Sequence, residues 1–177
     1  MGNYTKECYF LEFYMSKIGE SSKQKNLIPW KNNPDIDLYE CFEYNKNINI
    51  KYIKDGIFCY KCKREVDNIF GSNNLVYLPK YLIINLNREI INSYEGNVKI
   101  HENLDLSKYL MYTNSIRTMK LYAVICSDKP GHFVAFCKNV TTNEWNCYDD
   151  YNVTKCSEPE PYKKGKAYVL FYHDSQN

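Results

Sequence analysis

The spacing of apolar residues predicts a short helix near residue 40. Leu38, Cys41 and Phe42 recur with a period close to 3.6 residues, so they would share one face of a helix. Asp35 or Asp37 is suited to cap this helix, because a carboxylate accepts hydrogen bonds from the free backbone N–H groups of the first turn. The residues before it mix aromatic, charged and amide side chains without a clear period, and no element is predicted there.

After this helix the pattern changes to that of strands. Ile48–Ile53 alternates apolar and polar residues, and an Asp-Gly turn separates it from Ile57–Cys59, which predicts a strand pair or an extended ribbon. Tyr81–Asn87 is almost continuously apolar, so we expect a central strand buried on both faces. Leu104–Leu110 is expected to form one turn of helix. Four more strands are predicted at short spacing, over Leu121–Cys126, Phe133–Lys138, Glu144–Tyr148 and Ala167–Tyr172.

These elements predict an α+β domain, and its C-terminal half is expected to be an antiparallel sheet. With 177 residues and 44% hydrophobic content, the chain is long enough for one compact core. The formal net charge of +2 gives no large field that would attract nucleic acid, and we expect none to bind. The longest apolar runs, such as Tyr81–Ile84, fall far short of the ~20 residues that span a membrane.

The chain shows no signal peptide, so its eight cysteines are expected to be reduced thiols in an intracellular protein, either cytoplasmic or nuclear. No membrane association is predicted.

A histidine and two aspartates lie where a β-hairpin would bring them together. If the chain folds back near residue 141, His132 comes opposite residues 149–151, and opposed Cβ atoms lie about 4.5–5.5 Å apart. A carboxylate beside an imidazole fixes its tautomer and stabilises the imidazolium form, as in two-thirds of a catalytic triad. On spacing alone, a structural hydrogen bond at a strand end is the more common explanation. The register does not separate Asp149 from Asp150, because a slip of one residue exchanges the side chain that faces His132.

Several segments, in a fixed order, resemble one protein family. They are Leu78–Arg88, Asn103–Tyr109, Leu121–Ile125, Gly131–Lys138, Trp145–Asp150 and Ala167–Tyr172. From about Asp37 onward the chain is similar to the ubiquitin-specific proteases, the ubiquitin carboxyl-terminal hydrolases of peptidase family C19. The resemblance implies the C-terminal half of a papain-like cysteine protease fold. Residues 37–70 would be a remnant of its β-ribbon fingers and residues 71–174 its antiparallel palm, after a poorly assigned segment, 1–36.

The resemblance also implies an activity and roles for individual residues. Members of this family bind ubiquitin and hydrolyse the isopeptide bond after its C-terminal glycine. By this resemblance His132 is the general base, Asp149 orients it, and Asp150 supports the pair. Gly131 and Phe133 would lie beside the substrate, although Gly131 is equally well explained as a turn residue.

The nucleophile of this chemistry is not identified in the chain. The family carries its cysteine in a box of the type Gly-Asn-Thr-Cys-Tyr, and Gly2–Tyr9 resembles that box only loosely, because two extra residues separate Thr5 from Cys8. Four other cysteines fall in or beside predicted strands, where a free cysteine is usually a small buried hydrophobe: Cys126, Cys137, Cys147 and Cys156.

Three explanations for the missing nucleophile stay open: a truncated sequence, a partner chain that supplies it, or an inactive relative that only binds ubiquitin. The alternative function is therefore a catalytically inactive ubiquitin-binding or scaffold module of the same fold. A third hypothesis is an unrelated β-rich protein with a fortuitous His–Asp hairpin.

Cys59 and Cys62 resemble the zinc knuckle of the family's fingers. They supply two of the four ligands that structural zinc requires, and the companion pair is missing. Cys8, Cys41 or His101 are the residues that could complete the set. We predict no cofactor and no complete metal site, and treat the two cysteines as a degenerate zinc half-site.

Overall fold

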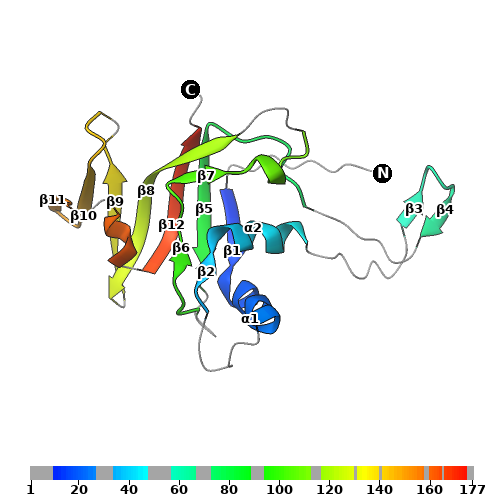
Figure 1. The fold of residues 1–177 in the computed structure, drawn as a ribbon, viewed down its shortest axis with the longest axis horizontal. Coiled ribbons are helices and arrows are strands. Elements are labelled where there is room, and N and C mark those ends of the chain that lie inside the picture. The colour runs from blue at the N-terminus through cyan, green and yellow to red at the C-terminus, as the bar shows by residue number, and fades with distance from the viewer. Residues whose placement is uncertain are drawn as a thin grey trace.

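The computed structural model describes residues 10–26, 34–47, 57–66, 73–88, 94–112, 117–129, 131–139, 141–157, 160–164 and 166–174. Its main feature is an eight-stranded sheet (Figure 1). In spatial order the sheet contains β1 (Phe10–Tyr14), β5 (Tyr81–Asn87), β12 (Lys166–Asp174), β8 (Thr118–Lys129), β9 (His132–Lys138), β10 (Trp145–Asp149) and β11 (Asn152–Lys155), with β7 (Asn103–Asp105) paired to β8 beside β9.

The sheet is antiparallel from β5 to β11, which confirms the antiparallel C-terminal half predicted from the sequence. All four strands predicted there are present. The exception to the antiparallel pattern is β1, which pairs in parallel with β5. A parallel strand at one edge of an otherwise antiparallel sheet makes the sheet mixed.

Two helices cover one side of the sheet near β1 (Figure 1). α1 spans Met15–Asn26 and α2 spans Leu38–Lys46. The predicted cap of α2 is confirmed as Asp37: its side chain accepts a hydrogen bond from the Tyr39 backbone, while the side chain of Glu40 accepts one from the Asp37 backbone. This reciprocal arrangement is a capping box, which satisfies two backbone donors at once.

The hydrophobic core lies between the helices and one face of the sheet. Leu38, Cys41 and Phe42, which the sequence placed on one helical face, are all buried in it. The expectation that Tyr81–Asn87 is buried on both faces is wrong. In β5, Leu82, Ile84 and Leu86 are buried, whereas the residues between them are partly exposed, because no element of the described residues covers the second face of the sheet there.

The described residues also form two short 3-10 helices and a pair of two-residue strands outside the main sheet. The turn of helix expected within Leu104–Leu110 is present as a 3-10 helix, η1 (Ser107–Tyr109), and a second one, η2 (Pro161–Lys164), precedes β12. β2 (Ile36–Asp37) pairs in parallel with β6 (Val98–Lys99). β1, α1 and β2 all lie in the N-terminal segment for which no element was predicted.

A separate hairpin stands apart from the main sheet (Figure 1). It consists of β3 (Ile57–Cys59) and β4 (Arg64–Val66), which pair antiparallel. β3 matches the second strand of the predicted pair, whereas Ile48–Ile53, the first strand, lies outside the described residues. Within the part of the chain that the structure describes, no helix is long and apolar enough to cross a membrane.

Candidate active site

His132 and Asp149 meet at one end of the β9–β10 hairpin. His132 is the first residue of β9 and Asp149 the last of β10. The hairpin pairs Lys138 with Trp145 and Ala135 with Tyr148, a register that continues toward His132 opposite residue 151. The predicted fold-back near residue 141 is thereby confirmed. The ring atom Nε2 of His132 lies 2.7 Å from Oδ1 of Asp149.

The hydrogen bond between these two side chains determines which ring nitrogen is free. An ionised carboxylate only accepts hydrogen bonds, so Nε2 of His132 is the donor to Asp149. In the neutral imidazole the proton on Nε2 leaves the lone pair of Nδ1 available as a base. The His132 side chain is 21% exposed and that of Asp149 46%, so the pair is accessible from solvent. This arrangement can accept a proton from an acid that reaches Nδ1.

Asp150 lies beside this pair, at the turn between β10 and β11. Its φ angle of 50° is in the left-handed region, which Asp tolerates better than most residues because its short side chain bonds locally. Ligand atoms of Asp150, Asp149 and His132 all lie within 4.8 Å of one another. The hydrogen bond to the ring is made by Asp149, so the structure separates the two aspartates that the register alone left equivalent.

Gly131 and Phe133 flank His132 in the chain. Gly131 has a φ angle of 78°, and nothing lies within 4 Å of the position that a Cβ would occupy. The backbone conformation of the turn therefore explains this glycine, as the turn interpretation expected, and steric crowding does not. Phe133 is 52% exposed, and its ring packs edge-on against Tyr168 at 5.1 Å.

The cysteines of the described residues range from buried to exposed. Cys41 and Cys126 are fully buried, and burial raises the pKa of each thiol to about 12. Burial also raises the pKa of Cys137. Cys147 and Cys156 pack against the core. No cysteine joins the cluster of His132 and the two aspartates within the described residues. Cys8 lies outside them.

Cys59 and Cys62 lie at the end of the β3–β4 hairpin. The backbone N–H of Cys62 donates a hydrogen bond to Sγ of Cys59 at 3.4 Å, and this contact contributes most to a lowered pKa of Cys59. The two thiols suit zinc, but four ligands are needed, and no third ligand group gathers at this hairpin among the described residues. Cys41 is buried in α2, and His101 instead contacts Asp37 at 2.7 Å. The residues described here do not form a complete zinc site.

Arg88 has a positioning role that its sequence context did not reveal. Only 4% of this residue is exposed, and its Nε donates to the carbonyl of Ala167 at 2.9 Å. One terminal nitrogen donates to the carbonyls of Tyr94 and Gly96, at 3.0 and 2.8 Å. Arg88 thus joins the end of β5 to the start of β12, whose Tyr168 packs against Phe133. The Ala167 carbonyl lies far along the chain from Arg88, so the local sequence pattern could not identify this contact.

Comparisons with known proteins agree with this geometry. The family model described as "Ubiquitin carboxyl-terminal hydrolase" matches residues 8–172. Ubiquitin carboxyl-terminal hydrolase 12 of Saccharomyces cerevisiae is 31% identical over 149 residues, which are 77% of this chain and 12% of that protein. Ubiquitin carboxyl-terminal hydrolase 9 of Arabidopsis thaliana is 31% identical over 170 residues, which are 90% of this chain and 18% of that protein. The chain thus spans less than a fifth of either relative.

Solved structures show the same fold. The SAGA DUB module with Ubp8, Sgf11, Sus1 and Sgf73, bound to monoubiquitin, contains a chain that matches with a TM-score of 0.66 at 23% identity. This match covers 80% of the present chain and 35% of the other. The same module bound to ubiquitin aldehyde matches with a TM-score of 0.66 at 20% identity, again over 80% of this chain. The expected α+β fold of papain-like type is therefore confirmed.

Proposed function

We propose a function on the premise that this chain belongs to the ubiquitin carboxyl-terminal hydrolase family. The family consists of deubiquitinating cysteine proteases. In our proposal the chain supplies the base and the orienting acid of such an enzyme, which hydrolyses the isopeptide bond after the C-terminal glycine of ubiquitin. The observation that carries the proposal is the 2.7 Å contact between His132 and Asp149 at an accessible end of the sheet.

The reaction begins with a cysteine thiol beside the free nitrogen of His132. Nδ1 accepts the thiol proton, and the thiolate attacks the glycyl carbonyl. Asp149 stabilises the imidazolium that forms and holds the ring in place. The imidazolium then donates its proton to the lysine amine as the amide bond breaks, which leaves a thioester. His132 then accepts a proton from a water molecule, whose oxygen attacks the thioester carbonyl. The C–S bond breaks, the carboxyl group of ubiquitin is released, and the imidazolium returns the proton to the sulfur, which regenerates the thiol.

The nucleophile in this proposal comes from outside the described residues. Cys41 and Cys126 are unsuited, because a thiol whose pKa is about 12 is almost entirely protonated at neutral pH. Candidates are Cys8 and a segment or partner chain that carries the family's cysteine box. If no such cysteine is ever supplied, the same fold can serve only as a ubiquitin-binding module.

Ubiquitin is the proposed partner. Two structural neighbours are described as bound to monoubiquitin and to ubiquitin aldehyde, in the same fold. Gly131 and Phe133 adjoin His132, so they are proposed to contact the tail of ubiquitin where it reaches the pair. Phe133 offers a half-exposed ring for this contact.

The test exposes the 177-residue chain to ubiquitin with a thiol-reactive C-terminal group, and measures its affinity for unmodified ubiquitin in parallel. We expect saturable binding without labelling of any cysteine from residue 10 onward. Labelling of Cys8 would support the protease function and identify that residue as the nucleophile. His132→Ala should then abolish the labelling, whereas Lys61→Gln, a change on the separate hairpin, should not affect it.

Absence of both binding and labelling would contradict the proposal. Binding alone, in a chain that also stays inactive when the family's cysteine-bearing segment is added to it, would favour the inactive binding module.

A further inference from the structure

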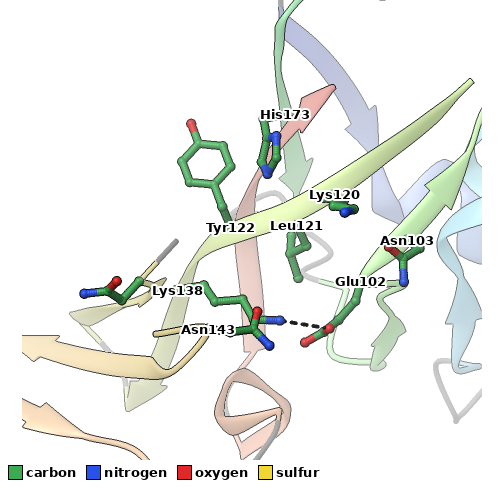
Figure 2. A pocket seen from close by; sticks show the side chains of 9 residues that line it. Glu102, Asn103, Lys120, Leu121, Tyr122, Lys138, Asn143 and His173 are labelled. Atoms are coloured by element: carbon green, nitrogen blue, oxygen red, sulfur yellow. Dashed lines mark hydrogen bonds and ion pairs between the residues drawn. The ribbon is translucent and has the colours of Figure 1, made fainter. Parts of the chain in front are cut away.

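A pocket lies at a gap in the main sheet. β8 pairs with β7 through Thr118–Lys120 and with β9 from Ala123 onward, so Leu121 and Tyr122 belong to neither ladder on that edge. The turn between β9 and β10 borders the gap on one side and the start of β7 on the other (Figure 2). The pocket has a volume of about 240 Å³.

This pocket is distinct from the candidate active site. His132 and Lys138 are the two ends of β9, a strand of seven residues, and Lys138 lines the pocket. At ~3.3 Å per residue, the two ends of the strand lie about 20 Å apart. A ligand in the pocket therefore does not contact the His132–Asp149 pair.

The lining of the pocket is rich in hydrogen-bond donors. Its described residues include two lysines, three asparagines and one histidine, and among them Glu102 alone carries a carboxylate. The aliphatic contribution is limited to Leu121. A pocket of this kind suits a polar ligand, because an apolar ligand would leave these donors without partners.

The charges in the pocket do not cancel. Nζ of Lys138 lies 3.1 Å from a carboxylate oxygen of Glu102, and the Lys138 side chain is only 18% exposed (Figure 2). The charges of Lys138 and Glu102 therefore cancel each other. Lys120 is also one of the residues that line the pocket, its side chain is exposed, and it forms no ion pair with any described residue. One ammonium group is therefore left without a counter-charge in the described part of the pocket.

We propose that this pocket binds an oxyanion group, either a phosphate or a carboxylate. Lys120 supplies the counter-charge, and the asparagine amides at the rim supply further N–H donors. Hydrogen bonds between a charged donor and an oxyanion are stronger than neutral ones, so Lys120 contributes most to the binding. Glu102 opposes the binding of an oxyanion, because its carboxylate repels the ligand and forms an ion pair with Lys138.

The test titrates inorganic phosphate into the 15N-labelled 177-residue chain at constant ionic strength and follows the amide resonances. We expect saturable shifts at Lys120, Tyr122 and Asn143. Lys120→Gln should weaken binding about tenfold, the loss expected for one charge-assisted hydrogen bond. Glu102→Gln should have the opposite effect and tighten binding several-fold, because it removes the repulsion and frees Lys138.

Lys61→Gln is the matched control, since it makes the same charge change on the exposed β3–β4 turn. It should leave the affinity for phosphate unchanged. A parallel titration with acetate distinguishes the two sources: binding of acetate identifies a carboxylate site, and binding of phosphate alone identifies a phosphate site. Shifts that do not saturate, or equal losses in Lys120→Gln and Lys61→Gln, would show non-specific attraction to surface lysines and overturn the proposal. Neither result bears on ubiquitin binding, which is tested separately.

Discussion

At the scale of single residues, the central feature is that the two ring nitrogens of His132 have different roles. Asp149 accepts from Nε2, so the base of the proposed reaction is Nδ1. Asp150 is close enough to add negative charge but makes no hydrogen bond to the ring in this structure. The two adjacent aspartates should therefore differ in their effect on the ring.

This difference can be measured by NMR. In the wild-type chain with a neutral His132 ring, the ring nitrogens should show the Nε2–H tautomer. Asp149→Ala removes the acceptor that fixes this tautomer, so the spectrum should shift to a mixture of both tautomers. Asp150→Ala should preserve the wild-type pattern. Equal effects of the two substitutions would contradict the assignment of Asp149 as the orienting residue.

The cysteines should differ widely in reactivity. Hydrogen bonds from Cys62 lower the pKa of Cys59, whereas burial raises that of Cys126 to about 12. Because the thiolate is the reactive form, alkylation of the native chain at pH 7 should modify Cys59 long before Cys126. Mass spectrometry of quenched samples gives the rate at each site. Comparable rates at Cys59 and Cys126 would show that Cys126 is not protected by the fold.

At the scale of elements, the cap of α2 combines a local hydrogen bond with contacts from β6 and from the residues that follow it. Asp37 accepts from the Tyr39 backbone, and its carboxylate also contacts His101 and Lys99, at 2.7 and 3.2 Å. Burial raises the pKa of Asp37, but these hydrogen bonds outweigh that effect, and its net pKa is lowered.

Removal of this cap should destabilise the protein. Asp37→Ala is expected to reduce the free energy of unfolding by about 0.5–2 kcal/mol, the usual cost of a lost N-cap. Asp37→Asn keeps a capping side chain but loses the charge, so its loss should be smaller. Urea denaturation of the three proteins at pH 7 measures both differences.

The pH dependence of this stabilisation has a defined sign. A carboxyl group whose pKa is lower in the folded state stabilises the fold above its unfolded pKa of about 3.9. The stabilisation is lost as the pH falls through the lower folded value. The advantage of the wild-type chain over Asp37→Asn should therefore shrink below about pH 4. An advantage that stays constant down to pH 2 would contradict the role of the charge.

The same scale shows what the sequence could and could not predict. The hairpin that joins His132 to Asp149 is local, so counting residues from its turn was sufficient to place the pair. α1 was missed because one of its core-facing positions is Ser22, a polar residue that is 4% exposed and donates to Glu40 at 3.3 Å. β1 was missed because its partner, β5, lies far along the chain. Neither Glu40, the partner of Ser22, nor β5, the partner of β1, can be recognised from the local sequence pattern.

At the scale of the whole molecule, one core supports both ends of the sheet. Its centre includes Ile84 of β5 and Leu170 of β12, which are paired in the sheet and have no exposed surface. The His132–Asp149 pair lies at one end of β9 and the oxyanion pocket at the other. Both sites therefore depend on the same packing.

A cavity in this core should affect the whole fold. Ile84→Ala is expected to reduce the free energy of unfolding by about 2–5 kcal/mol, because it removes buried methyl groups and leaves a void. Tyr151→Ala is the control, since Tyr151 is fully exposed and its loss should change stability by less than about 0.5 kcal/mol. Denaturant unfolding compares the two. A loss below about 1 kcal/mol for Ile84→Ala would contradict the packing of β5 against the core.

The account as a whole rests on the claim that ubiquitin places its tail beside His132. The most direct measurement is an NMR titration of the labelled chain with ubiquitin and with ubiquitin that lacks its C-terminal glycines. With full-length ubiquitin we predict saturable binding and shifts at Gly131, His132 and Phe133. With the truncated ubiquitin we predict no shifts at these residues. Absence of binding, or identical shifts with both forms, would contradict the claim.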